Sequence, residues 1–342
     1  MKKYFLPITK IALILVYLVI VAGALVRMTG SGMGCPDWPK CFGYYIPPTE
    51  ESELLFTPNK SYKKGMVIIK NQSLLVARED FTTTNTFSEA NWEKYTKHDY
   101  AIFNPSHTWV EYINRLFGAL AGIACFASFI VSFSFWKTNK KLVFYTFIIC
   151  FLMGFQAWLG KTVVDSVLNP VKITTHMLAA FLIVGLQLYL IFYFQKNQSK
   201  VFTYHSNFKT ALVITLVLTL VQVVLGTAVR EHVDTISETG LPKETWLQNP
   251  TLSFYIHRSF SILVTLAIGY LVYLNSRLKL GYTKIKFAAA LVVFEILSGI
   301  AMYYFYFPFG SQTIHIVLSS LLFGFLFYLV LESFQSKKQL LN

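Results

Sequence analysis

Gly23-Ala-Leu-Val-Arg27 closes the first apolar run of this chain, and Gly226-Thr-Ala-Val-Arg230 closes the fifth. Each of these runs is long enough to cross a hydrocarbon layer of about 30 Å as a helix. Because the same ending returns after four runs, the sequence indicates a tandem repeat of a four-run unit. The fold can then be predicted from the other residues that recur between the two units.

Eight apolar runs have the length of a membrane-spanning helix. We place them at 8–28, 109–136, 142–160, 172–194, 210–230, 251–275, 287–306 and 312–334. The chain has 54% hydrophobic and 14% charged residues, with a mean hydropathy of +0.50, which is typical of membrane proteins. The first run is interpreted as a helix and not as a signal peptide, because it ends in Arg27 without a clear small-residue cleavage site.

The net charge of +13 is spread over short connections between the runs. We therefore interpret it as topological charge and expect membrane lipid, and no nucleic acid, around this chain. Lys and Arg are concentrated at the N-terminus, in every second connection and in the tail. The positive-inside rule then predicts that both termini are cytoplasmic and that the long segment 29–108 lies outside.

The repeat extends to other runs. Phe155, Gly160 and His176 return as Phe294, Gly299 and His315, each 139 residues later, and Asn114-Arg115 corresponds to His257-Arg258. We predict an all-α, polytopic membrane protein of eight transmembrane helices, arranged as two tandem pseudo-symmetric four-helix bundles. Residues 1–200, with the outer loop 29–108, form the first half, and residues 201–342 form the second.

Three histidines, His176, His257 and His315, fall near the outer ends of predicted helices. A single histidine in a membrane helix is often only a hydrogen-bonded structural residue, but three at repeat-related positions favour cofactor ligands. Neutral imidazole binds haem iron, and a haem between helices takes one histidine from each of two of them. We predict that His257 and His315 are the axial ligands of a haem in the second half.

The first half repeats this pair incompletely. His176 corresponds to His315, but Asn114 takes the place of His257, and asparagine is not a usual axial ligand. His107 is the nearest substitute, but it lies roughly 10 Å further along a helix. The two halves are therefore predicted to hold unequal sites with different roles.

Glu111 shares one helical face with Asn114 and Arg115. A carboxylate facing lipid would cost about 3 kcal/mol, so we expect it to face the bundle interior. It either forms a salt bridge with Arg115 or acts as an acid–base or charge-stabilising group, which makes it the candidate catalytic residue. The second half has Phe254 at this position, so the carboxylate belongs to one half only.

Several other polar residues have two interpretations. The arginines near outer helix ends either snorkel to the interface or pair with haem propionates; they are Arg27, Arg115, Arg230 and Arg258. Glu295, aligned with Gln156, is interpreted as a buried hydrogen-bonded residue and not as a catalyst. Cys35 and Cys41 lie on the outer side, where disulfides persist, and form either a disulfide or a redox-active dithiol, against the alternative of unpaired thiols. No role is assigned to the polar stretch 42–105.

Together these residues resemble those of the haem A synthase family, membrane enzymes that make the cofactor of haem–copper terminal oxidases. The segment from Gly23 to Cys41 resembles the family's first helix end and cysteine loop. Glu111-Tyr-Ile-Asn-Arg115 resembles its Glu-x-x-His-Arg motif, with Asn114 in place of the histidine. The other three histidines fall where the family has its own. The outer segment 42–108 is long for the family, and 231–250 lacks the cysteine pair that some members carry.

The resemblance implies oxidation of the C8 methyl group of haem O to a formyl group, which gives haem A. It implies a resident haem b on His257 and His315, and haem O as substrate in the first half, with His176 as axial ligand and Glu111 beside the methyl group. It implies redox chemistry or haem handling at the cysteine pair, and a bacterial cytoplasmic membrane as location. Haem O synthase and the machinery of terminal oxidase assembly are the implied partners, and a homo-oligomer is compatible with this reading.

Two other classes of function stay open. A di-haem b-type cytochrome carrying electrons from quinol would use the histidines, but it predicts two complete pairs and leaves Glu111 and the cysteine loop unexplained. A transporter of haem or a small molecule would more often show broken helices with midplane Gly or Pro, whereas the polar residues of this chain gather near the outer surface. The missing ligand at Asn114 agrees with a substrate that must leave, because weaker axial ligation eases release.

Overall fold

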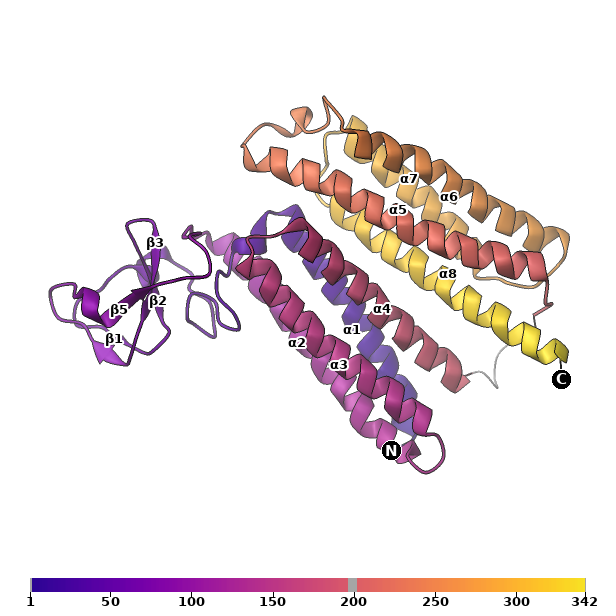
Figure 1. Ribbon diagram of the computed structural model, residues 1–342, viewed down its shortest axis with the longest axis horizontal. Helices are drawn as coiled ribbons and strands as arrows, with labels where there is room; N and C mark the ends of the chain where they lie inside the picture. Colours follow the sequence, from indigo (N-terminus) through magenta and orange to yellow (C-terminus); the bar gives the residue numbers. More distant parts are fainter. Residues whose placement is uncertain (1, 196–201, 342) are drawn as a thin grey trace.

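The computed structural model describes residues 2–195 and 202–341, and these form eight long helices (Figure 1). The helices are α1 (Lys2–Met28), α2 (Pro105–Ser132), α3 (Lys140–Asp165), α4 (Pro170–Gln195), α5 (Ser206–Glu238), α6 (Leu252–Arg277), α7 (Ile285–Tyr304) and α8 (Ser311–Leu341). All eight are long and apolar enough to cross a membrane, which confirms the predicted polytopic helical protein. The predicted boundary between residues 200 and 201 lies outside the described residues.

Several helix ends lie a few residues beyond the predicted runs, as at the start of α1 and the ends of α3 and α8. Polar contacts account for two of the differences. Helix α2 begins at Pro105, ahead of the expected start at 109, because the Asn104 side chain accepts the backbone N–H of His107 at 3.2 Å and proline suits the first helical position. Helix α5 continues past the apolar run to Glu238, and an ion pair of 2.5 Å between Arg230 and Asp234 supports its last turns.

Helices α1–α4 and α5–α8 lie in two bundles, each with its own apolar core (Figure 1). The first core takes Val16, Ala121, Ile149 and Val184 from its four helices. The second takes Leu212, Ile268, Ala288 and Leu326. Outward-facing side chains on both bundles are also apolar and exposed, as a helix in lipid requires.

Helix α8 packs against the first bundle as well as its own. Phe323 stacks on Phe181 of α4 with ring centres 5.0 Å apart. Gly324 lies under Tyr17 of α1, where a Cβ atom would come within 2.4 Å of the phenol oxygen. A side chain at residue 324 would therefore displace the Tyr17 ring from its place between α1 and α8.

The segment between α1 and α2 forms a small β unit that projects beyond the bundle ends (Figure 1). Its strands are β1 (Ser61–Tyr62), β2 (Val67–Lys70), β3 (Ser73–Ala77), β4 (Phe81–Thr82) and β5 (Trp92–Lys94). Strand β1 pairs with β4, and β3 pairs with both β2 and β5, all antiparallel. No strand was predicted for this unit from the sequence. Short 3-10 helices lie at Ser31–Met33, Glu51–Leu54, Glu89–Asn91, Phe133–Phe135 and Lys243–Thr245.

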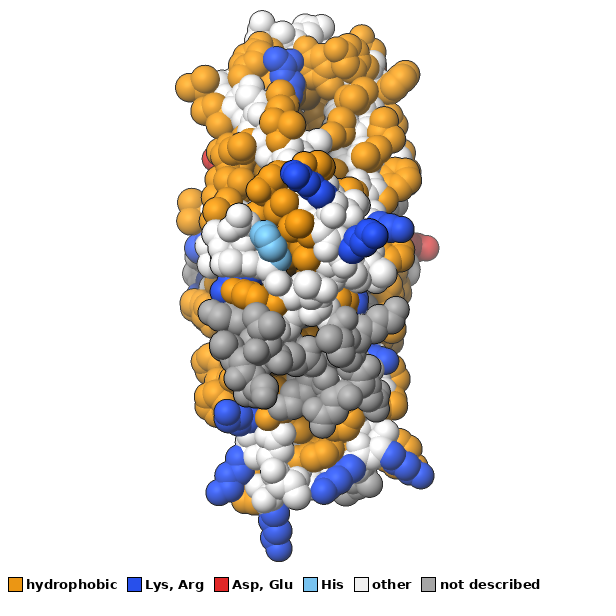
Figure 2. Space-filling model, turned by 90° about the vertical axis from the view of Figure 1, so that its right-hand side faces the viewer, with side chains coloured by type: hydrophobic (Ala, Val, Ile, Leu, Met, Phe, Trp, Pro, Cys, Tyr) orange, Lys and Arg blue, Asp and Glu red, His pale blue; other side chains and the backbone are white. Residues whose placement is uncertain are grey.

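Basic residues gather at the end of the molecule opposite the β unit. Figure 2 views this end, where Lys and Arg side chains are numerous and Asp and Glu are scarce. The α2–α3 connection there carries Lys137, and the α6–α7 connection carries Lys279 and Lys284. This end of the helices is therefore basic.

Candidate functional site

His257 on α6 and His315 on α8 face each other in the second bundle. Their ring centres are 6.4 Å apart, and the ring planes make an angle of 68°. Two imidazoles bonded to one metal ion between them have ring centres roughly 6 Å apart, since each metal–nitrogen bond takes about 2 Å and each nitrogen lies about 1 Å from its ring centre. The separation therefore fits bis-histidine ligation of a single iron.

Two residues of α7 orient the His315 ring. Its Nδ1 lies 2.8 Å from Glu295 Oε2 and 2.8 Å from Ser298 Oγ. A carboxylate that accepts the Nδ1 proton fixes the tautomer, and this leaves the Nε2 lone pair for a metal. Glu295, interpreted from sequence as a buried hydrogen-bonded residue, makes its contact with the His315 ring nitrogen.

A glycine of the preceding helix faces each of the three helix histidines, and another faces Asn114, which takes the place of the fourth. The nearest contact is at Gly226, where a Cβ atom would come 3.0 Å from His257 Cε1. The corresponding distances are 3.5 Å from Gly160 to His176 Cε1, 3.9 Å from Gly299 to His315 Cε1 and 3.8 Å from Gly23 to Asn114 Oδ1. Only the Gly226 contact is tight, so that a Cβ atom there would require the His257 ring to move by a few tenths of an ångström; the others are ordinary van der Waals distances.

The first bundle has a different arrangement around His176. Asn114 Oδ1 and His176 Nδ1 are both buried and have no hydrogen-bond partner among the described residues. Gln156, at the position of Glu295, donates its Nε2 to the backbone carbonyl of His176 at 2.9 Å and not to the ring. Leu159 stands where Ser298 stands in the second half. The halves thus differ at the ligand position and around the shared histidine.

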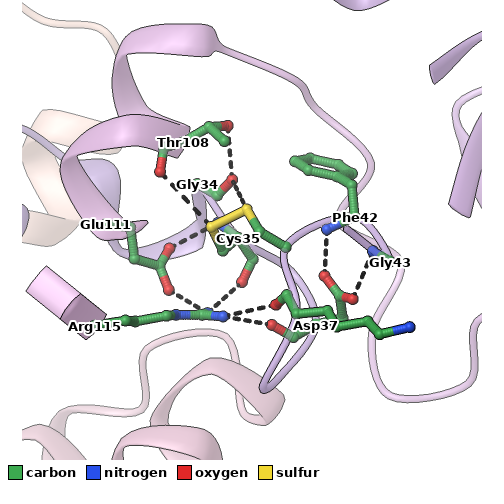
Figure 3. The surroundings of a disulfide bond; sticks show 10 residues. Gly34, Cys35, Asp37, Phe42, Gly43, Thr108, Glu111 and Arg115 are labelled. Atoms are coloured by element: carbon green, nitrogen blue, oxygen red, sulfur yellow. Dashed lines mark hydrogen bonds and ion pairs between the residues drawn. A yellow bond between two sulfur atoms is a disulfide. The ribbon is translucent and has the colours of Figure 1, made fainter. Parts of the chain in front are cut away.

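Glu111 is buried and has both carboxylate oxygens engaged (Figure 3). Oε1 accepts from Arg115 Nη2 at 2.5 Å, and Oε2 accepts the backbone N–H of Cys35 at 2.8 Å. The salt bridge that the sequence left as one of two alternatives is therefore present. It also anchors the loop that carries the cysteines.

Cys35 and Cys41 form a disulfide, which the sequence analysis had weighed against a free dithiol and unpaired thiols. Arg115 donates to three carbonyl oxygens of this loop, those of Cys35 at 2.8 Å, Asp37 at 2.7 Å and Lys40 at 2.9 Å (Figure 3). One arginine therefore holds both Glu111 and the disulfide loop on the outer part of α2.

Asp37, which the sequence analysis did not select, closes the same loop. Its carboxylate accepts the backbone N–H groups of Phe42 and Gly43 at 2.5 and 2.8 Å. Burial raises the pKa of Asp37, although these N–H groups and Arg115 act in the opposite direction. Its place between the two cysteines was the only signal in the sequence.

Residues 8–75 and 66–327 match the COX15-CtaA family, described as cytochrome oxidase assembly protein. The chain belongs to this family. A heme A synthase of Shewanella oneidensis is 23% identical over 337 residues, which cover 90% of this chain and 89% of the relative. A heme A synthase of Orientia tsutsugamushi (strain Boryong) is 25% identical, and the match covers 89% of this chain and 89% of the relative. A heme A synthase of Ehrlichia canis is 21% identical, and the match covers 96% of this chain and 92% of the relative. The matched residues include both bundles and every candidate site residue.

In this member of the COX15-CtaA family, two of the four arginines join the halves. Arg27 of α1 donates Nε and Nη2 to Asp234 Oδ2 at 3.0 and 2.8 Å, and Arg230 pairs with Asp234 Oδ1 at 2.5 Å. Arg230 also donates to Gln312 of α8 and to the backbone carbonyl of Arg27. Asp234 was missed from sequence: its i,i+4 spacing from Arg230 was the available signal, whereas its other partner, Arg27, lies 207 residues away.

Arg258 contrasts with its repeat counterpart Arg115. It is exposed and lies beside the rings of Phe254 and Tyr255, 5.9 and 5.5 Å from their centres. Among the described residues no carboxylate pairs with it, so its guanidinium is the one of the four that is open to an anionic ligand.

Proposed function

We propose that this chain is a haem A synthase, which oxidises the C8 methyl group of haem O to a formyl group. The observation that carries the proposal is the unequal pair of sites: a complete histidine pair in one bundle, and one histidine with a buried carboxylate in the other. Relatives named heme A synthase match about nine-tenths of this chain. Cytochrome oxidase assembly, which the family description names, is the process that would use the product.

The second bundle is proposed to hold a resident haem b on His257 and His315. When bound, this group supplies electron transfer. Glu295 keeps the His315 ring in one orientation, and Gly226 leaves room for the His257 ring against α5. Arg258 is available for a propionate, whereas Arg27 and Arg230 are already engaged with Asp234.

The first bundle is proposed to hold the substrate haem O with His176 as axial ligand. Glu111 does not move freely, since Arg115 and the Cys35 N–H each hold one of its oxygens. A carboxylate oxygen has more than one lone pair, so each can still accept a proton or orient a water beside the methyl group. The proposed role of Glu111 is to stabilise positive charge that develops there, or to orient the attacking water.

We place the chain in a bacterial cytoplasmic membrane with both termini in the cytoplasm. The basic end in Figure 2 is the expected cytoplasmic side. The disulfide and the β unit lie at the opposite end, where an oxidising compartment keeps the bridge formed. The proposed partners are the enzyme that supplies haem O and the terminal oxidase assembly machinery.

The test is haem identification. The full chain is expressed with and without a haem O-forming enzyme, purified, and its extracted haems are separated by chromatography and weighed. Haem A or its hydroxylated precursor beside haem B supports the synthase. Haem B alone, with haem O available, would replace it with a b-type electron carrier.

A further inference from the structure

We infer that Asn114 leaves one axial side of the first-bundle haem without a protein ligand, so that this haem is held through His176 alone and its other face takes water or a small neutral ligand. This inference rests on the proposed function, because it takes the first bundle as a haem site.

The positions of Asn114 and His257 are equivalent in the structure as well as in the repeat. Asn114 faces Gly23 of α1 as His257 faces Gly226 of α5. A Cβ atom at Gly23 would lie 3.8 Å from Asn114 Oδ1, compared with 3.0 Å between Gly226 and the His257 ring. The helix pair therefore keeps a glycine opposite the ligand position, but the side chain there is shorter and is not a usual ligand for haem iron.

The amide of Asn114 fits a polar role beside the open position. Its Oδ1 is buried and has no hydrogen-bond partner among the described residues. Burying such an atom costs free energy unless a partner is present, and a water or similar small molecule would supply one. An amide also offers two N–H donors, so Asn114 can hold a small ligand without bonding to the metal.

The remaining ligand is also weaker than its counterpart. His315 has a carboxylate at 2.8 Å from Nδ1, whereas Nδ1 of His176 has no partner in the part of the chain that the structure describes. Gln156 is turned to the backbone carbonyl of His176. An imidazole without such an acceptor is a poorer donor to iron. Nδ1 of His257 has no partner among the described residues either, so the second bundle favours retention through the acceptor on His315 and through its second histidine, and the first bundle has neither.

The test is the spin state and carbon monoxide binding of the haems in the purified full-length chain. Wild-type protein with two haems should show one low-spin and one high-spin ferric signal by electron paramagnetic resonance, and carbon monoxide should bind roughly half of the reduced haem. Asn114→His should convert the high-spin signal to low-spin and lower carbon monoxide binding about tenfold or more. Asn114→Ala is the matched control and should keep the high-spin signal.

The reciprocal variant His257→Asn should create a second high-spin haem or lose the second-bundle haem. Two low-spin haems in the wild type, with no carbon monoxide binding, would overturn the inference, as would a high-spin signal lost in Asn114→Ala. A chain with a single low-spin haem would overturn it too. Two haems with the predicted spin states but no haem A would leave the inference standing and remove the proposed function.

Discussion

Replacing Glu295 with glutamine removes the negative charge beside His315 and keeps an acceptor of nearly the same size. The carboxylate lies 2.8 Å from His315 Nδ1, and its side chain is only 12% exposed, so water cannot replace it easily. Removing a partner of a metal-bound histidine typically lowers metal affinity 10- to 100-fold, or by about 1.4 to 2.7 kcal/mol. We expect Glu295→Gln to lose haem b faster by a factor in this range and to have a higher reduction potential.

The assay is transfer of haem from purified protein to an excess of apomyoglobin, together with a redox titration followed at the haem absorption bands. Gln156→Glu is the matched variant in the first bundle, where adding a carboxylate near His176 should slow haem loss. Glu295→Ala separates charge from orientation, because it removes the acceptor altogether. If Glu295→Gln retained haem and potential as the wild type does, the carboxylate would not be acting through His315, and the reasoning would be refuted.

Three further predictions concern the outer end of the bundles. Glu111→Gln should abolish haem A formation while haem b content stays at the wild-type value, measured by haem extraction; normal haem A yield would rule out a catalytic role. Asp234→Ala leaves Arg27 and Arg230 facing each other without a carboxylate, so the melting temperature in detergent should fall by the equivalent of roughly 3 kcal/mol for a partly buried pair. Asp99→Ala, which removes the carboxylate of the exposed Lys94–Asp99 ion pair, is the control and should leave the melting temperature unchanged. Cys35→Ser should free the loop that anchors Glu111 and lower haem A yield, with Cys41 then reacting with a thiol reagent; unchanged yield would show that the bridge is dispensable.

The membrane-spanning helices could be predicted because a lipid environment allows few solutions. Backbone groups must be satisfied within each helix, so an apolar run of sufficient length specifies both the element and its approximate ends. The repeat then related residues such as His176 and His315, since helices of equal register bring equivalent positions to equivalent places. These constraints act locally along the sequence.

The contacts that were missed depend on packing between distant segments. Asp234 lies beyond the apolar run of α5, and only the packing of the two bundles against each other brings Arg27 to it. Glu111 had two open interpretations because its contact with Cys35 requires the outer loop to fold back on α2. The β unit gave a weak signal, since its strands are two to five residues long and its hairpin turn is Asn71-Gln72, without the glycine that marks such turns.

The central claim is that two unequal haem sites in this chain make haem A. Its most direct test is to follow an isotopically labelled carbon of the substrate. The purified full chain is loaded with haem O carrying carbon-13 at the C8 methyl group, reoxidised through an added electron acceptor, and its haems are analysed by mass and magnetic resonance. The account predicts that the label appears in the formyl carbon of haem A in the wild type and stays in the methyl group in Glu111→Gln. Unchanged haem O in wild-type protein that holds both haems would contradict it.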